Sequence, residues 1–368
     1  MIIEYEYLIS ENMVKTFEAT DTSKLKECYL YEKQKNKVVR CSTCSRRCLI
    51  GEGHTGFCLV RKNIGGSLYA LNYSKIATMN IDPIGKKPLA HFHPNSNVLS
   101  IATMGCNFRC AYCCNWMISQ PEKMEGEDIP PEKIVQIAKD SLVDGISYTY
   151  TEPTIFFEIC HDTGKLAKEA GLFNTWVTNG YFTKELIDKG RDYIDAMTVD
   201  FKASGNLDFY KKFVQINDVE PIYENLKYIK KKGIYFEITD LIVPKVGDNL
   251  DEVRALAEWI RDNLGRETTL HLLRFYPSYK MMDYPDTPVE TLEKAQKIAS
   301  EYLDYVLLGN VQGHPGENTY CPNCHSLVIG RYGFLVMKWN LDKDNRCMNC
   351  GYKIPIVGSL KYPMPSFG

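Results

Sequence analysis

The strongest constraint on the fold is a regular alternation, through the middle of the chain, of short apolar runs with longer stretches of helical apolar spacing. The runs have the length and the β-branched and aromatic content of buried strands. Strands that alternate with helices of about ten or more residues form βαβ units and a parallel sheet. The sequence therefore predicts an α/β fold with a partial or complete TIM-like (β/α) barrel. The expected strands span residues 98–104, 145–150, 173–179, 196–201, 234–243, 270–276 and 305–310, and the expected helices lie within 131–144, 153–171, 183–194, 223–233, 250–265 and 287–303.

Most of the 14 cysteines fall into three clusters that are far apart along the chain. In a long chain without an export signal, short spacings between cysteines indicate metal ligation rather than disulfides, because reduced thiolates are soft metal ligands. The clusters are Cys41, Cys44, Cys48 and Cys58; Cys106, Cys110 and Cys113; and Cys321, Cys324, Cys347 and Cys350. We therefore expect three metal sites.

Charge and hydropathy exclude several classes of protein. The formal net charge of -2 argues against a globally basic nucleic-acid binder and against a polybasic membrane protein. The N-terminal residues carry glutamates where a secretory signal carries lysines, and no apolar stretch approaches the ~20 residues that span a bilayer. We expect a cytoplasmic protein with no membrane partner.

The middle cluster has the spacing C-x3-C-x2-C and directly follows the first expected strand. Three thiolates on one loop can hold three irons of a 4Fe-4S cube and leave the fourth iron without a protein ligand. An open position on a metal is what catalysis requires, whereas a structural site is closed by its ligands. The alternative is a zinc site of three cysteines and one histidine, for which the closest candidates are His91 and His93.

Polar residues collect where the expected strands end. In parallel barrels the carboxyl ends of the strands carry the chemistry, because loops can vary there without disturbing the core. We therefore take these residues as one candidate site. They are Cys106 to Cys113 after the first strand, Glu152 after the second, Asn179 at the end of the third, Asp200 and Lys202 in the fourth, and His271 and Arg274 in the sixth.

Several motifs, taken in order, resemble the radical S-adenosylmethionine (SAM) superfamily, and within it the radical SAM proteins of the AmmeMemoRadiSam system, which are similar to pyruvate formate-lyase activating enzymes. The resemblance covers about residues 28 to 357, and its departure is Cys114, where the family pattern has glutamine. The motifs are CSTCSRRCLIGEGHTGFC, DPIGKKPLAHFHP, GCNFRCAYCCNW, YTYTEPTIFFE, TNGY, VDFK, LHLLRFYPSYKM and NTYCPNC.

The resemblance implies a radical SAM barrel and an enzyme that cleaves SAM reductively at a 4Fe-4S cluster. The product would be a 5′-deoxyadenosyl radical that abstracts hydrogen from an unidentified substrate, either a protein side chain or a nucleotide of a nucleic acid. The electron would come from a donor such as flavodoxin or ferredoxin. The substrate of an activase, a glycine on a partner enzyme, is an alternative that rests on analogy. Another alternative is a non-catalytic, zinc-rich scaffold or binding module.

The resemblance also implies roles for single residues. Tyr112 would lie over the cluster edge, and Glu152 would receive the methionyl amino group of SAM. Asn179, Asp200 and Lys202 would face the ribose and the methionyl carboxylate. His271 and Arg274 are candidates for the adenine or substrate side. For Asp200 and Lys202 an ordinary ion pair is the alternative.

The two terminal cysteine sets predict small lobes at both ends of the barrel. We expect residues 1–95 to form an N-terminal segment, 96–312 the barrel, and 313–368 a zinc-ribbon or rubredoxin-like lobe whose residues 331–341 form a β-hairpin. The N-terminal set, Cys41 to Cys58, fits zinc or a second iron-sulfur cluster, and we expect zinc because a loop-rich segment gains its fold from a closed structural metal. That segment would pack across the barrel mouth or over its base.

Overall fold

A nine-stranded sheet forms the centre of the computed structural model, which describes residues 22 and 25–361. Its strand order is β15-β14-β13-β12-β11-β10-β8-β7-β9, and the seven strands from β8 to β15 in this order are parallel. Because β15 and β9 are the two edges, the barrel is partial, within the α/β fold that the sequence predicts. The parallel strands are β8 (Asn97–Thr103), β10 (Gly145–Tyr148), β11 (Phe173–Thr178), β12 (Ala196–Lys202), β13 (Tyr235–Ile242), β14 (Leu270–Arg274) and β15 (Val306–Gly309).

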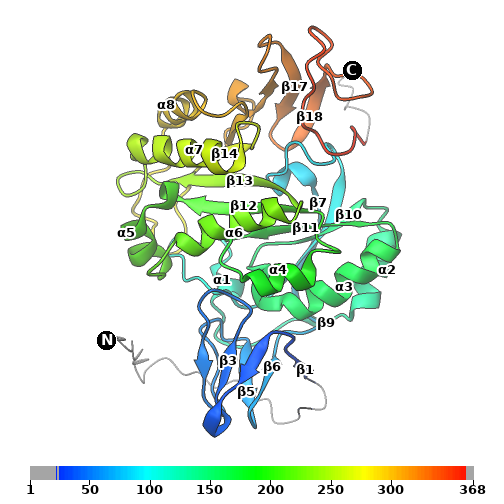
Figure 1. Ribbon diagram of the computed structural model, residues 1–368, viewed down its shortest axis with the longest axis vertical. Helices are drawn as coiled ribbons and strands as arrows, with labels where there is room; N and C mark the ends of the chain where they lie inside the picture. Colours follow the sequence, from blue (N-terminus) through cyan, green and yellow to red (C-terminus); the bar gives the residue numbers. More distant parts are fainter. Residues whose placement is uncertain (1–21, 23–24, 362–368) are drawn as a thin grey trace.

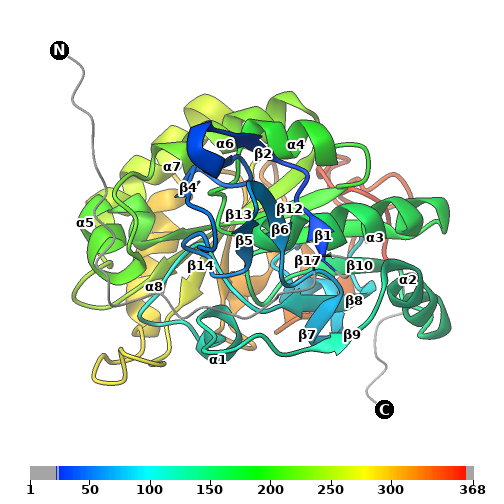
Figure 2. The same cartoon turned by 90° about the horizontal axis from the view of Figure 1, so that it is seen from below.

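Helices follow the strands in an arc around the sheet (Figure 2). Each buries one apolar face, as α2 does with Ile134, Val135 and Ala138, which lie on one side of a helix. Pro131 occupies the first helical position of α2, where a missing N–H costs nothing. The main helices are α2 (Pro131–Asp140), α3 (Phe157–Glu169), α4 (Lys184–Gly190), α6 (Glu220–Lys231), α7 (Leu250–Leu264) and α8 (Val289–Ala299), with shorter α1 (Trp116–Ser119) and α5 (Leu207–Phe209).

Two strands that the periodicity did not predict extend the sheet at one edge. The strand β7 (Lys75–Pro83) pairs antiparallel with β8, and the short β9 (Glu127–Asp128) pairs antiparallel with β7. The sheet therefore begins inside the segment 1–95. The expected division of the chain at residues 95 and 312 stays a prediction.

The N-terminal lobe consists of two small antiparallel sheets and lies at one end of the molecule (Figure 1). It contacts the segment that follows β11, where the N–H of Ser45 donates to the carbonyl of Tyr181 at 2.9 Å and the Thr183 hydroxyl donates to the carbonyl of Ser42 at 2.7 Å. This lobe therefore lies on the carboxyl side of the parallel strands. Its strands are β1 (Lys26–Glu27), β2 (Tyr31–Lys33), β3 (Val39–Cys41), β4 (Leu49–Ile50), β5 (Arg61–Ile64) and β6 (Ser67–Ala70).

The C-terminal lobe lies at the opposite end (Figure 1) and contains β16 (Thr319–Tyr320), β17 (Leu327–Tyr332) and β18 (Leu335–Trp339). The antiparallel pairing of β17 with β18 is the hairpin expected there. The lobe packs on the segment before β8, where the N–H of His93 donates to the carbonyl of Val357 at 2.8 Å. The two cysteine lobes thus flank opposite ends of the parallel strands. In the described part of the chain no helix has the length and apolar character needed to cross a membrane.

Candidate functional site

The three cysteines of the C-x3-C-x2-C motif lie on the loop that leaves the carboxyl end of β8. Gly105 begins this loop with a φ of 101°, and a Cβ there would come within 2.6 Å of a Val60 methyl group and 2.9 Å of the Cys58 carbonyl. Only glycine therefore lets the loop approach the N-terminal lobe so closely. Backbone hydrogen bonds hold the rest of the loop, among them one from the N–H of Ala111 to the carbonyl of Phe213 at 2.8 Å.

Burial disfavours free thiolates at this loop. It raises the pKa of Cys106 and Cys113, and burial together with the neighbouring Cys113 raises the pKa of Cys110 to about 12. The charge of Lys202 opposes the shift at Cys110. Coordination removes this penalty, because a metal-bound thiol is deprotonated outright. Three partly buried cysteines on one loop therefore fit as ligands of a 4Fe-4S cluster with an open iron.

The alternative zinc site with a histidine ligand lacks its histidine. His91 lies at the amino end of the strands, where its ring nitrogens contact Thr269 at 3.0 Å and Thr319 at 2.8 Å. His93 stacks on Phe173, the first residue of β11. Both histidines lie at the amino end of the strands, whereas the loop of Cys106 lies at the carboxyl end.

Glu152 connects the ends of two neighbouring strands. It follows β10, is 3% exposed, and accepts hydrogen bonds from the Thr178 hydroxyl and the N–H of Asn179, each at 2.7 Å. A third bond comes from the N–H of Thr154 at 3.1 Å. Burial raises the pKa of Glu152, while these donors oppose the shift. The carboxylate thus fixes the TNG turn against the TEPT segment.

The candidate residues on β11 and β12 point toward the cysteine loop. The Asn179 amide donates to the side-chain oxygen of Asn107 at 2.7 Å, next to Cys106. Lys202 and Asp200 form an ion pair at 3.0 Å, and the charges of both act on Cys110. An ammonium and a carboxylate, both partly exposed, are therefore available beside the expected open iron. Their assignment to SAM stays a prediction.

The other three candidates lie in different surroundings. Tyr112 is buried, with its ring 5.7 Å from that of Phe209 and 6.5 Å from that of Phe275. Arg274, at the carboxyl end of β14, pairs with Asp286.

His271 is near the amino end of β14, and its Nε2 contacts Glu237 at 2.6 Å. The structure therefore does not bring His271 to the cysteine loop.

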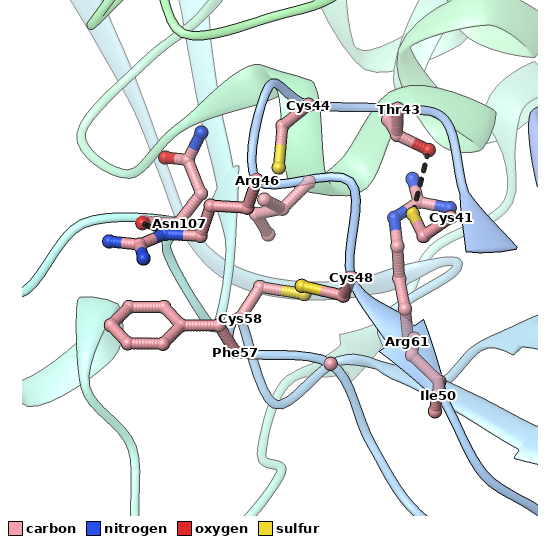
Figure 3. A pocket seen from close by; sticks show the side chains of 12 residues that line it. Cys41, Thr43, Cys44, Arg46, Cys48, Ile50, Phe57, Cys58, Arg61 and Asn107 are labelled. Atoms are coloured by element: carbon pink, nitrogen blue, oxygen red, sulfur yellow. Dashed lines mark hydrogen bonds between the residues drawn. The ribbon is translucent and has the colours of Figure 1, made fainter. Parts of the chain in front are cut away.

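The four N-terminal cysteines line one pocket (Figure 3), together with Arg46, Phe57, Arg61 and Asn107. Burial raises the pKa of Cys44 and Cys58, and raises that of Cys48 to about 11. Arg46 at the pocket wall donates from Nε to the carbonyl of Asn107 at 2.6 Å. The N-terminal set is thus adjacent to the loop of Cys106.

The C-terminal cysteines form a compact four-sulfur group. Their ligand atoms all lie within 4.8 Å of one another, and among the residues that the structure describes no other cluster of three or more cysteine, histidine or acidic side chains does so. The Sγ atoms are 3.5 Å apart for Cys321 and Cys350 and 3.7 Å apart for Cys324 and Cys347. A tetrahedron with metal–sulfur bonds of ~2.3 Å has edges of ~3.8 Å, so these distances fit one metal ion.

Three residues at the site were not predicted from the sequence. Asn107 and Thr178 contact candidate residues through their side chains, as described above. Arg109 donates to the carbonyl of Cys106 at 2.8 Å and to the carbonyl of Phe57. The position of Arg109 between two cysteines of the motif was a signal that could have identified it.

The chain is similar to several known proteins. The profile of the Radical SAM superfamily matches residues 100–260. An uncharacterized protein of Methanocaldococcus jannaschii is 50% identical over 90% of this chain and 100% of its own length. The pyruvate formate-lyase-activating enzyme of Clostridium pasteurianum is 24% identical over 54% of this chain and 89% of its own. A crystal structure of a radical SAM methyltransferase from Sphaerobacter thermophilus has 15% identity and a TM-score of 0.46 over 60% of this chain and 70% of its own. The chain carries the radical SAM domain of this superfamily of enzymes.

Proposed function

We propose that this enzyme holds a 4Fe-4S cluster on Cys106, Cys110 and Cys113, cleaves SAM reductively, and abstracts hydrogen from a macromolecular substrate. The observation that carries the proposal is the placement of three partly buried cysteines on one loop at the carboxyl end of the parallel strands, beside Lys202 and Asp200. When bound, the cluster supplies the electron that splits SAM into methionine and a 5′-deoxyadenosyl radical.

The protein side chains then bind and orient SAM. In this proposal the Lys202 ammonium binds the methionyl carboxylate, and Asp200 accepts hydrogen bonds from the ribose hydroxyls. Glu152 supplies negative charge for the methionyl amino group, and its bonds to the TNG turn keep Asn179 in place. Tyr112 and Arg274 would border the cluster and the substrate side.

The substrate class rests on resemblance. The ordered motifs are similar to those of the AmmeMemoRadiSam proteins, and a relative is named as a pyruvate formate-lyase-activating enzyme. The named relative favours a macromolecular substrate, namely a glycine on a partner protein. A flavodoxin-like or ferredoxin-like protein would deliver the electron.

The test is anaerobic incubation of the purified protein with dithionite and SAM, followed by quantification of 5′-deoxyadenosine. We expect slow formation of this product by the unaltered protein and none by Cys110→Ala. Cys114→Ala is the matched control, because Cys114 is exposed and adjacent to the motif but outside it. Product formation by Cys110→Ala would refute the cluster assignment.

Candidate substrates labelled with deuterium then identify the hydrogen donor. Mass spectrometry of the 5′-deoxyadenosine reports whether deuterium is transferred. A partner protein deuterated only at glycine would label the product if the enzyme is an activase. Labelling from another residue type or from RNA would exclude the activase function.

A further inference from the structure

We propose that Cys41, Cys44, Cys48 and Cys58 hold a second iron-sulfur cluster, which passes electrons to the cluster on Cys106, Cys110 and Cys113. This inference rests on the proposed function for the receiving cluster. It replaces the zinc ion that the composition of the N-terminal segment favoured.

The spacing of the sulfurs distinguishes the two terminal sites within one protein. The C-terminal sulfurs are close enough for one metal ion, with all four ligand atoms within 4.8 Å. In the described residues, no three of the N-terminal sulfurs meet that limit, although all four line the same pocket. A cube does not require the four sulfurs to converge on one point, because each thiolate binds a different iron and inorganic sulfide lies between the irons.

Two unpaired N–H donors line the same pocket. The side chain of Arg61 is almost fully buried, and its Nε has no hydrogen-bond partner. The Nδ2 atom of Asn107, whose residue is 0% exposed, is likewise buried without an acceptor. A buried donor without an acceptor costs roughly 1 to 3 kcal/mol. The sulfides of a cluster would accept these bonds, and such bonds also set its reduction potential.

Apolar side chains complete the pocket. Ile50, Phe57 and Ile155 line it, so water is largely excluded from the space between the sulfurs. Cys41, Cys44 and Cys58 are buried, whereas Cys48 is partly exposed. The exposed edge at Cys48 is therefore where a docked electron carrier would approach.

The pocket and the proposed SAM-cleaving site share a wall. Asn107 lines the N-terminal pocket and is the residue next to Cys106, so the pocket borders the loop that carries the SAM-cleaving site. Arg46 and Arg109 bind the two segments together through the carbonyls of Asn107, Cys106 and Phe57. Gly105 lets the cysteine loop contact the Cys58 carbonyl. The C-terminal site, at the other end of the strands, has no such contact with this loop in the described residues.

The electron balance is simple. A reduced flavin or iron-sulfur carrier protein loses one electron to the N-terminal cluster. That cluster is reoxidised when it reduces the cluster on Cys106, Cys110 and Cys113, and SAM is the final acceptor. No bond forms or breaks at the N-terminal site.

The metal content of a variant that lacks the SAM-cleaving site tests the first half of the proposal. After anaerobic reconstitution, Cys106→Ala, Cys110→Ala and Cys113→Ala in one chain should leave ~4 irons, compared with ~8 in the unaltered protein. The remaining cluster should give a reduced paramagnetic resonance signal that SAM does not change. A variant with no iron and two zinc ions per chain would overturn the proposal.

Changing the electron donor tests the second claim, that the N-terminal cluster passes electrons to the cluster on Cys106, Cys110 and Cys113. In Cys44→Ser, the rate of 5′-deoxyadenosine formation with reduced flavodoxin, divided by the rate with dithionite, should fall at least tenfold relative to the unaltered protein. Arg47→Ala is the matched control, because Arg47 lies in the same segment and pairs with exposed Glu185 instead of lining the pocket. Equal rates with flavodoxin would overturn the relay.

If Cys44→Ser does not fold, the paramagnetic resonance signal of the N-terminal cluster in the unaltered protein provides a second test. After reduction by one electron per chain, addition of SAM should remove the N-terminal signal as 5′-deoxyadenosine forms. Persistence of that signal during product formation would contradict electron transfer. If the N-terminal cluster is present but the unaltered protein never cleaves SAM, the proposed function fails and the second cluster stands.

Discussion

Arg61 and Glu158 form a bidentate ion pair, in which Nη1 of Arg61 donates to Oε1 at 3.1 Å and Nη2 donates to Oε2 at 2.7 Å. Their side chains are 2% and 1% exposed. Arg61 belongs to β5 of the N-terminal lobe, and Glu158 belongs to α3 beside the sheet. The Glu158 carboxylate also accepts the N–H of Tyr29 at 3.0 Å. One buried carboxylate therefore connects the N-terminal lobe to the barrel.

Replacement of Glu158 should destabilise the protein strongly. Glu158→Ala leaves the buried Arg61 guanidinium without its partner, which typically costs about 3 to 5 kcal/mol. Urea unfolding under anaerobic conditions measures this loss. The control is Glu185→Ala, which breaks the more exposed pair with Arg47 and should cost less than about 1 kcal/mol. Similar losses in both variants would contradict the connecting role of Glu158.

Asp200→Ala should weaken SAM binding and leave the cluster absorption spectrum unchanged. The loss of one hydrogen bond to a charged group costs roughly 1.5 to 3 kcal/mol, or about tenfold to a hundredfold in affinity. Equilibrium binding of SAM to the reconstituted protein measures it. The exposed carboxylate of Asp188, which pairs with Lys232, supplies the control variant Asp188→Ala. Unchanged affinity in Asp200→Ala would leave Asp200 and Lys202 as an ordinary ion pair.

His91 should make the fold sensitive to acid. Burial, with a smaller effect from the Arg331 charge, lowers the pKa of His91 to about 3. In the unfolded chain a histidine binds its proton near pH 6.5, so unfolding takes up a proton between these values and stability falls as the pH drops. Between pH 7 and pH 5 this histidine alone should remove about 2 kcal/mol.

The His91→Asn variant tests this pH dependence. Its melting temperature should change less between pH 7 and pH 5 than that of the unaltered protein, although the variant is less stable at both. His54→Asn, at an exposed histidine of the N-terminal lobe, should keep the original pH dependence. An unchanged pH dependence in His91→Asn would show that other groups cause the acid sensitivity.

The C-terminal cysteines should bind one zinc ion that supports the lobe and takes no part in SAM cleavage. Joint replacement of Cys324 and Cys347 by serine should remove the zinc and speed hydrogen exchange in β17 and β18. Iron content and 5′-deoxyadenosine formation should stay unchanged, because the lobe lies at the amino end of the strands. His325→Ala, next to Cys324 but outside the four-sulfur group, should keep the zinc. A red, iron-containing lobe would indicate a rubredoxin-like site instead.

Reasoning from the sequence located the parallel strands well, because burial on both faces leaves a continuous apolar run that is readable locally. The expected strand at 234–243 is β13 (Tyr235–Ile242), and the one at 98–104 is β8 (Asn97–Thr103). The strand β7 was not predicted, because most of its residues are partly exposed and leave no continuous apolar run. Its pairing with β8 is antiparallel, outside the βα repeat. The contact of His271 with Glu237 on β13 joins two strands, so it is not readable from either segment alone.

The sequence by itself determined the three cysteine clusters and the βα repeat. Cysteine spacing and apolar periodicity are local properties, so they can be read without knowing how segments meet. The tertiary structure decided which cysteine set lies beside the loop of Cys106, Cys110 and Cys113. Two contacts hold the N-terminal lobe beside this loop. Gly105 has no side chain and so lets the Cys58 carbonyl approach closely. Arg61 pairs with Glu158, which is 97 residues away in sequence. Such contacts depend on long-range packing of side chains that carry no pattern in the sequence between them.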